Sequence, residues 1–537
     1  MKKPIPLSSL LKKKIEEEQE DSKEAVEVTD ETSELYKDLT SNIEKIKQLL
    51  GKSNDITFRE LTITQKPFTQ GTAVFINNIV DEQIVNEHVL EAIIQYPFEK
   101  ELEKENLFSI LEKETLSVLD VNVLNRWDDI ANEIVSGHTV IFVNGINEVV
   151  SCKTNGGNYR SIEEPSTEVT VRGPKEGFVE SLPINISLVR RKIKSPDLQV
   201  EKKKLGKITK TNIAVLYVKS VANEKIVQEV MARLNRIEID SILSSANIEE
   251  LVQDGTFTPF PTVFNTERPD IVSSELMEGR VAIIVEGTPF VLIVPTSFPQ
   301  FFKSAEDYYQ RFDIASLIRI LRYIAFTISL LGPSIYIALI TFHQDLIPTT
   351  LLINLAAQRE GIPFPALIEA FIMELTFEVL REAGIRMPRA IGQAVSIVGA
   401  LVIGQAAVQA GIVSASMVIV VALTGIASFT TPSYNLAIAA RMLRFFMMLV
   451  AATFGLYGVM MGIIVIVAHI CSLRSFGVPY LYPIAPFSLT GQADGLIRAP
   501  LWWMKNRPHL ISRGRTKNMP KDLHPTPTTK GDTNDST

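Results

Sequence analysis

Three glutamates, Glu374, Glu378 and Glu382, recur at every fourth position of a segment that is otherwise largely apolar. Residues four apart lie on one face of an α-helix, so the spacing predicts a helix over residues 366–382 with one acidic side. Carboxylates in this arrangement can attract cations, and in an oligomer they would form a charged ring. A solvated helix face is the plainer interpretation, and Arg381 can pair with Glu378 in either case. The amphipathic pattern favours a helix in the membrane interface or beside a polar cavity.

The next segment, residues 390–410, is rich in Gly, Ala and Gln. On a helix, one of its faces would carry Ala394, Val398, Leu401, Gln405 and Val408. Small residues around the bulky Leu401 are typical of a narrow pore with a hydrophobic constriction, so we expect these residues to line a pore. Glycines such as Gly399 and Gly404 also permit close helix approach, and plain helix packing is the alternative.

A third candidate is the charged stretch at residues 160–180, where acidic and basic residues alternate with Pro and Gly. These residue types resist regular structure, so an exposed loop is one interpretation. The other is an ordered segment of ion pairs that joins subdomains or subunits. We predict that Glu168, Arg172 and Lys175 are structural interface residues, because no nucleophile or metal-ligand set accompanies them.

The sequence contains no pattern that is typical of an enzyme. It lacks a nucleophile elbow, a phosphate-binding Gly-rich loop and a zinc-protease motif. The two cysteines, Cys152 and Cys471, lie far apart and the six histidines are scattered, so neither a cofactor nor a metal centre is expected. The net charge of -7 argues against nucleic acid as a partner.

The acidic helix and the predicted pore helix both lie within a region of long apolar runs, between residues 314 and 473, which must position them. Four segments are long enough to span a membrane: residues 317–342, 390–410, 412–430 and 445–473. Basic residues flank both ends of this region and no signal peptide is evident, so both termini are expected on the cytoplasmic side, with four spans. Arg441 and Arg444 do not fit a four-span count. Either they belong to a buried polar site or a shorter apolar piece also crosses.

The preceding part of the chain is charged, and strand-like and helical patterns alternate in it. For example, residues 139–143 and 148–152 flank the turn Asn144-Gly145. The predicted fold is an α/β soluble N-terminal region of two small subdomains, followed by an all-α multi-span membrane bundle. The expected parts are a charged disordered arm (1–54, with a helix possible at 36–50), two subdomains (55–200 and 201–305), a membrane domain (306–498) and a polar disordered tail (499–537).

Several long motifs together resemble the GerA family, the A subunits of spore germinant receptors of Bacillus-type endospore formers. They are residues 163–178 (EEPSTEVTVRGPKEGF), 258–273 (TPFPTVFNTERPDIVS), 316–322 (SLIRILR), 342–348 (FHQDLIP), 359–365 (REGIPFP), 380–388 (LREAGIRMP) and 402–408 (VIGQAAV). The resemblance runs from about residue 72 to residue 498. It implies the spore inner membrane as the location and, as partners, a permease-like B subunit and a lipoprotein C subunit. It also implies a ring, a pentamer in the family, that conducts ions through a constriction at the helix that contains Leu401.

Three functions are therefore considered. The first is a nutrient-gated ion conduit within a receptor complex. The second is a non-conducting signalling or scaffold subunit of the same complex. The third, a secondary transporter or lipid-handling protein, would require two similar halves with broken helices, and the sequence has no internal repeat.

Overall fold

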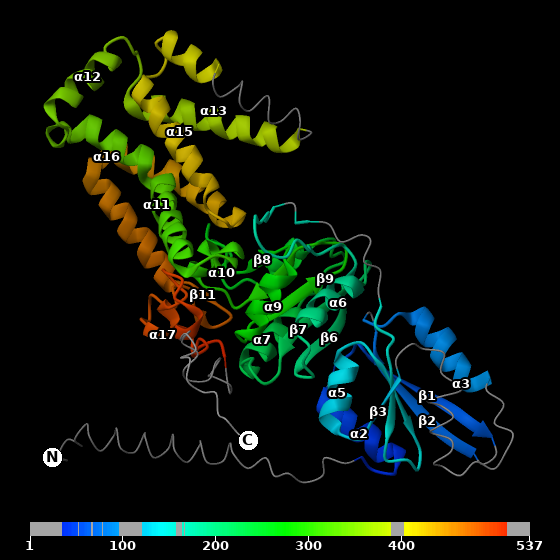
Figure 1. Ribbon diagram of the computed structural model, residues 1–537. Coiled ribbons are helices and arrows are strands. Elements are labelled where there is room, and N and C mark those ends of the chain that lie inside the picture. Colours follow the sequence, from blue (N-terminus) through cyan, green and yellow to red (C-terminus); the bar gives the residue numbers. More distant parts are fainter. Residues whose placement is uncertain are drawn as a thin grey trace, which may run out of the picture. The chain divides into compact units, whose positions relative to one another are not determined.

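The computed structural model describes residues 35–51, 53–65, 68–77, 79–95, 121–156, 164–165, 167–387 and 402–512 (Figure 1). These residues form two compact units. One holds the described residues up to 156 together with Lys194–Pro196, and the other holds the chain from Asp197 onward together with the segment that ends at Ile193.

The first unit is a five-stranded antiparallel sheet with helices on both faces. Its strands, in spatial order, are β1 (Ile56–Gln65), β2 (Phe68–Ile76), β4 (Thr139–Val143), β5 (Val149–Cys152) and β3 (Val121–Leu124). Its helices are α2 (Leu39–Leu50), the π-helix η1 (Ile84–Leu90) with α3 (Glu91–Gln95), and α5 (Trp127–Val135). Side chains alternate between two cores, because Val74 packs with α2 and α5 whereas Phe75 packs with η1 and α3.

The second unit contains a sheet of the same design. Its strands, in spatial order, are β6 (Leu198–Leu205), β7 (Thr211–Val218), β9 (Val281–Val285), β10 (Val291–Val294) and β8 (Phe264–Thr266). Helices α6 (Leu182–Lys192) and α9 (Pro269–Met277) pack on one face, and α7 (Glu224–Asn235) and α8 (Ser245–Val252) on the other. The predicted soluble region of two small α/β subdomains is confirmed, with all strands antiparallel in the described part of both sheets.

The element bounds differ from the expected divisions in two places. Helix α2 lies inside the range 1–54 and buries Ile46 and Leu50 against the first sheet, so the fold begins earlier than residue 55. Strand β6 crosses the expected boundary at residue 200, and α6 before it already packs on the second sheet. The expected arm falls mostly on residues 1–34, which lie outside the described residues.

The second unit continues into a helical region. Its helices include α10 (Glu306–Tyr309), α11 (Phe312–Phe342), α12 (Thr349–Arg359), α13 (Ala366–Arg386), residues 402–409, α15 (Ala415–Phe429) and α16 (Tyr434–Ser472). Of the described helices, α11 and α16 are long and apolar enough to cross a membrane, and α15 is apolar but shorter. Helix α11 continues through Pro333. The predicted span at 390–410 falls mainly on residues 388–401, outside the described residues.

Helix α16 consists of two halves that meet at Gly455, whose φ of 61° and ψ of -145° are not helical. A side chain added at Gly462 would come within 2.5 Å of the Met447 sulfur, so the two halves pack against each other as a hairpin. The predicted single span at residues 445–473 therefore contains a chain reversal. An unbroken helix over the 39 residues of α16 would measure about 58 Å, well beyond a bilayer core of about 30 Å.

The chain then returns to the second sheet, in the orange and red segment below α16 in Figure 1. This return contains β11 (Arg474–Ser475), β12 (Val478–Pro479), α17 (Leu489–Gln492) and the 3₁₀ turn η5 (Leu501–Trp503). Phe476, Val478 and Ile511 join the core beneath α7 and α8. The first residues of the expected tail, 499–512, are thus part of the fold, and residues 513–537 lie outside the described residues.

Candidate functional site

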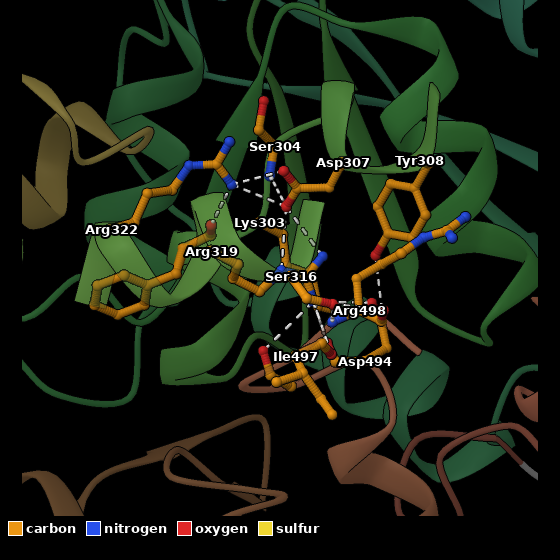
Figure 2. Close-up of polar contacts among 12 residues, drawn as sticks. Lys303, Ser304, Asp307, Tyr308, Ser316, Arg319, Arg322, Asp494, Ile497 and Arg498 are labelled. Carbon is orange, nitrogen blue, oxygen red and sulfur yellow. Dashed lines mark hydrogen bonds and ion pairs between the residues drawn. The ribbon is translucent and has the colours of Figure 1, made fainter. Parts of the chain in front are cut away.

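A buried network of charges lies where the second sheet, the start of α11 and the C-terminal return meet (Figure 2). Lys303 follows the 3₁₀ turn η3 (Phe298–Phe302), Asp307 and Tyr308 lie on α10, and Asp494 follows α17. The first turns of α11 carry Arg319 and Arg322. Two parts of the chain that are distant in sequence, residues 303–322 and the return at Asp494, therefore supply one network.

Arg319 is the centre of this network, and its side chain is 0% exposed. Its Nε and Nη2 donate to Asp307 Oδ2 at 3.1 and 3.0 Å, and its Nη1 donates to Asp494 Oδ1 at 3.0 Å. Arg322 adds a second guanidinium, with Nη1 2.8 Å from both oxygens of Asp307. Such charge-assisted contacts fix direction as well as distance, so α11 is held at a defined angle to α10 and to the return.

Asp494 binds two further donors, the ammonium of Lys303 and the hydroxyl of Tyr308 at 2.6 Å. Burial acts to raise the pKa of Asp494, but the positive charges of Lys303 and Arg319 outweigh it and lower this pKa below its usual range. Burial likewise acts to lower the pKa of Lys303, and the Asp494 carboxylate outweighs it and raises that pKa. Both groups are therefore charged at neutral pH, and each depends on the other.

A second set of charges lies inside the helical region. Arg444 on α16 donates from Nε to the Ser329 carbonyl at 2.7 Å and from Nη2 to the Ser329 hydroxyl at 3.1 Å. Its Nη1 pairs with Glu374 Oε2 on α13. One arginine thus joins α16, α11 and α13, so Arg444 belongs to a buried polar site.

The other predicted acidic residues are also paired. Glu378 is half-buried between Arg381, which donates to it from Nε and Nη2, and Arg441, whose Nη1 lies 3.6 Å away. Glu382 is exposed and pairs with Arg386. The three glutamates do not form one continuous solvated face, because Glu374 is enclosed by helices whereas Glu382 faces outward.

Outside that triplet, Glu369 was missed by the sequence analysis. It is fully buried, accepts hydrogen bonds from the backbone N–H and hydroxyl of Ser414 at 3.0 and 2.9 Å, and pairs with Arg359 at 3.2 Å. It therefore ties α13 to α12 and to the start of α15. Glu369 precedes Glu374 by five residues, so the four-residue spacing did not reveal it.

The predicted pore residues are only partly visible. Ala394, Val398 and Leu401 lie outside the described residues. Gln405 is exposed on the helical segment 402–409, and Val408 is half-buried against the cluster that includes Met417 and Met373.

The described residues 167–174 of the charged stretch are held by a residue outside it, Arg268. Its guanidinium is 1% exposed, pairs with Asp270, and donates to the carbonyls of Glu168 and Pro174 at 3.1 and 2.8 Å. The Glu168 carboxylate accepts from Thr266, and burial raises its pKa to about 7. Arg172 is exposed, and the exposed Lys175 lies 3.6 Å from Glu164. The sequence Thr-Glu-Arg-Pro-Asp at the end of β8 was the available signal for Arg268.

These arrangements hold elements together and order charges, and they place no nucleophile beside a base. Within the described ranges, no group of three or more His, Cys, Asp or Glu side chains could hold a metal ion.

Comparison with known proteins agrees with the motifs. The family described as Bacillus/Clostridium GerA spore germination protein matches residues 44–510. Spore germination protein KA of Bacillus subtilis (strain 168) is 50% identical over 489 residues, covering 91% of this chain and 89% of that protein. The uncharacterized membrane protein YfkQ of the same strain is 46% identical over 476 residues, covering 89% and 92%.

Among solved structures, the N-terminal domain of the A subunit of the Bacillus megaterium spore germinant receptor GerK3 is 37% identical. It matches with a TM-score of 0.41 over 50% of this chain and 98% of that domain. On the extent of the family match and the identity to its relatives, the chain belongs to the GerA family of spore germination proteins.

Proposed function

We propose that this chain is the A subunit of a germinant receptor in the spore inner membrane and that copies of it form a ring, which opens as an ion conduit when a nutrient binds. From the family resemblance, the ring is a pentamer and the partners are a permease-like B subunit and a lipoprotein C subunit. Both termini lie on the cytoplasmic, or core, side. The role of the chain is not enzymatic.

The main support for the proposed ion conduit is the exposed face of the helical segment 402–409. Gln405 is exposed there beside Val402 and Ile403, which are 56% and 40% exposed. An amide that faces lipid costs about 2–7 kcal/mol without a hydrogen-bond partner, so this face should meet water or another subunit. In a ring of subunits, one such face from each copy would enclose a channel, with Leu401 one turn from Gln405 as the constriction.

The two buried charge networks support a role in gating. The network around Arg319 connects the second sheet to the base of α11, and Arg444 connects α11 to α13, the helix that leads to the proposed pore segment. A movement of the sheet can therefore reach α13 through charged contacts that have few alternative partners.

The direct test is reconstitution of the purified chain alone in liposomes that contain a trapped ion indicator. A conduit-forming subunit should increase ion permeability, at least when the constriction is shortened by Leu401→Ser. Protein that inserts and forms rings but leaves permeability at the level of empty liposomes in both forms would favour the scaffold function.

A further inference from the structure

A cavity of about 550 Å³ lies between the second sheet and the loop that joins α15 to α16. Four charged side chains line it from facing elements: Glu168 and Glu249 on the sheet side, and Arg381 and Arg441 on the side of the helices. Lys303 and Arg268 also line it, but each is paired with an aspartate, Asp494 and Asp270 respectively.

The helix side carries excess positive charge. Arg381 and Arg441 share a single carboxylate, Glu378, and Arg441 also donates from Nε to the Ala437 carbonyl at 3.2 Å. A guanidinium has five N–H donors, so these contacts leave donors on both arginines. Arginine pairs of this kind suit a phosphate group.

The sheet side carries acidic groups that are bound by neutral donors. Glu168 accepts from the Thr266 hydroxyl, and Glu249 accepts from the Asn265 amide at 3.4 Å. Burial raises the pKa of both carboxyls, because it disfavours their charged form. A bound ammonium group would stabilise that charged form, so both carboxyl groups are suited to accept hydrogen bonds from it. A ligand that matches both walls carries a phosphate at one end and a primary ammonium at the other.

The surroundings of the cavity favour a lipid as the source of this ligand. Phe429 and Tyr434, at the ends of α15 and α16, line the cavity and are 66% and 58% exposed. Aromatic residues of this kind are typical of the level of lipid headgroups. One face of α15 leads away from the cavity and is exposed and apolar: Ile419, Leu423, Ile426 and Phe429.

We propose that this cavity binds the headgroup of an ethanolamine phospholipid, with the phosphate at Arg381 and Arg441 and the ammonium at Glu168 and Glu249. The acyl chains then lie along the exposed face of α15. The site would make the contact between the sheet and the helices depend on lipid composition. This proposed lipid site does not depend on the proposed ion conduction.

The test uses the full-length protein in detergent, with an equimolar mixture of ethanolamine, choline and glycerol phospholipids that have identical acyl chains. Native mass spectrometry measures which lipid stays bound. Ethanolamine lipid should be retained about tenfold over choline lipid, because a quaternary ammonium has no N–H to donate to the two glutamates. Arg381→Gln should weaken retention of both by loss of the phosphate contact, and Glu168→Gln should remove the preference for ethanolamine.

Arg386→Gln is the matched control, because Arg386 lies on the same helix in an exposed pair and should leave retention unchanged. Equal retention of the three lipids by the wild-type chain would overturn the proposal, as would full ethanolamine preference in Glu168→Gln. Glu168→Gln keeps an acceptor for Thr266 and so tests the site even if Arg381→Gln fails to fold. If free phosphoethanolamine displaces the lipid at equal concentration, the ligand is a soluble zwitterion and the lipid assignment is wrong.

Discussion

Arg444 and Glu374 form an ion pair in which the two side chains are only 1% and 0% exposed. The pair joins the first half of α16 to α13 at a depth where Ser329 of α11 supplies the remaining hydrogen bonds of the guanidinium. Because a lone charge in an apolar region is costly, neither residue is expected to tolerate loss of the other.

We therefore predict that Glu374→Gln and Arg444→Gln each lower the free energy of unfolding by about 3–5 kcal/mol, since each leaves one buried charge without its partner. The double variant should recover part of this loss. Thermal unfolding in detergent measures the effect, and Arg386→Gln, in an exposed pair, is the control. Additive losses in the double variant would mean that the two side chains do not interact.

A second prediction concerns Asp494, which binds Lys303, Tyr308 and Arg319. Asp494→Asn keeps the size of the side chain but removes its charge, and should lower stability by about 3 kcal/mol. The return after α16 should also become more accessible to protease, because its ionic contacts with α10 and α11 weaken. Asp313→Asn changes an exposed carboxylate on α11 and should have no measurable effect. Unchanged proteolysis of Asp494→Asn would show that apolar packing alone holds the return.

The third prediction is a pH dependence at Glu168, whose pKa is raised to about 7 by burial. The folded state favours the protonated carboxyl, so this contribution to stability is present below the ordinary pKa of 4.5 and is lost as pH rises through about 7. Glu168→Gln removes this dependence. The comparison is made in detergent without ethanolamine lipid. The melting temperature of the variant minus that of the wild type should increase from pH 5 to pH 8. A constant difference across this range would contradict the raised pKa.

The fourth prediction separates Arg268 from Arg172. Arg268→Ala should destabilise the folded chain by about 3–5 kcal/mol, because it leaves Asp270 and the carbonyls of the 167–174 segment without their donor. The exposed Arg172 should behave differently. Arg172→Ala should change the stability of the single chain by less than about 0.5 kcal/mol and lower the amount of assembled complex. Normal assembly and germination with Arg172→Ala would exclude an interface role for this residue.

Much of the fold followed from local pattern. Two short apolar runs around the Asn144-Gly145 turn indicated β4 and β5, and the four-residue period of the glutamates indicated α13. The hairpin at Gly455 could not be predicted in this way, because its two halves form one continuous apolar run. A reversal depends on a single backbone conformation and on the contact between Met447 and Gly462.

Less of the candidate site could be predicted from the sequence. The basic residues at the start of the first predicted span, which include Arg319 and Arg322, were interpreted as orientation signals. Both pair with the buried Asp307, and the buried Arg319 also pairs with Asp494. Asp494 lies 175 positions after Arg319, and no local spacing indicates a contact over such a distance. Glu374 was predicted as part of an acidic helix face, and its pairing with Arg444 on α16 could not be predicted because it depends on how three helices pack.

The most direct test of ion conduction is the behaviour of spores that carry Leu401→Ser. A ring of leucine side chains blocks ions by excluding water, so a small polar side chain at this position should let ions pass without a signal. We expect germination in the absence of nutrient, or failure during sporulation, whereas Ile403→Val should behave like the wild type. Normal protein levels with tight, nutrient-dependent ion release in the Leu401→Ser spores would contradict the account and favour a non-conducting scaffold.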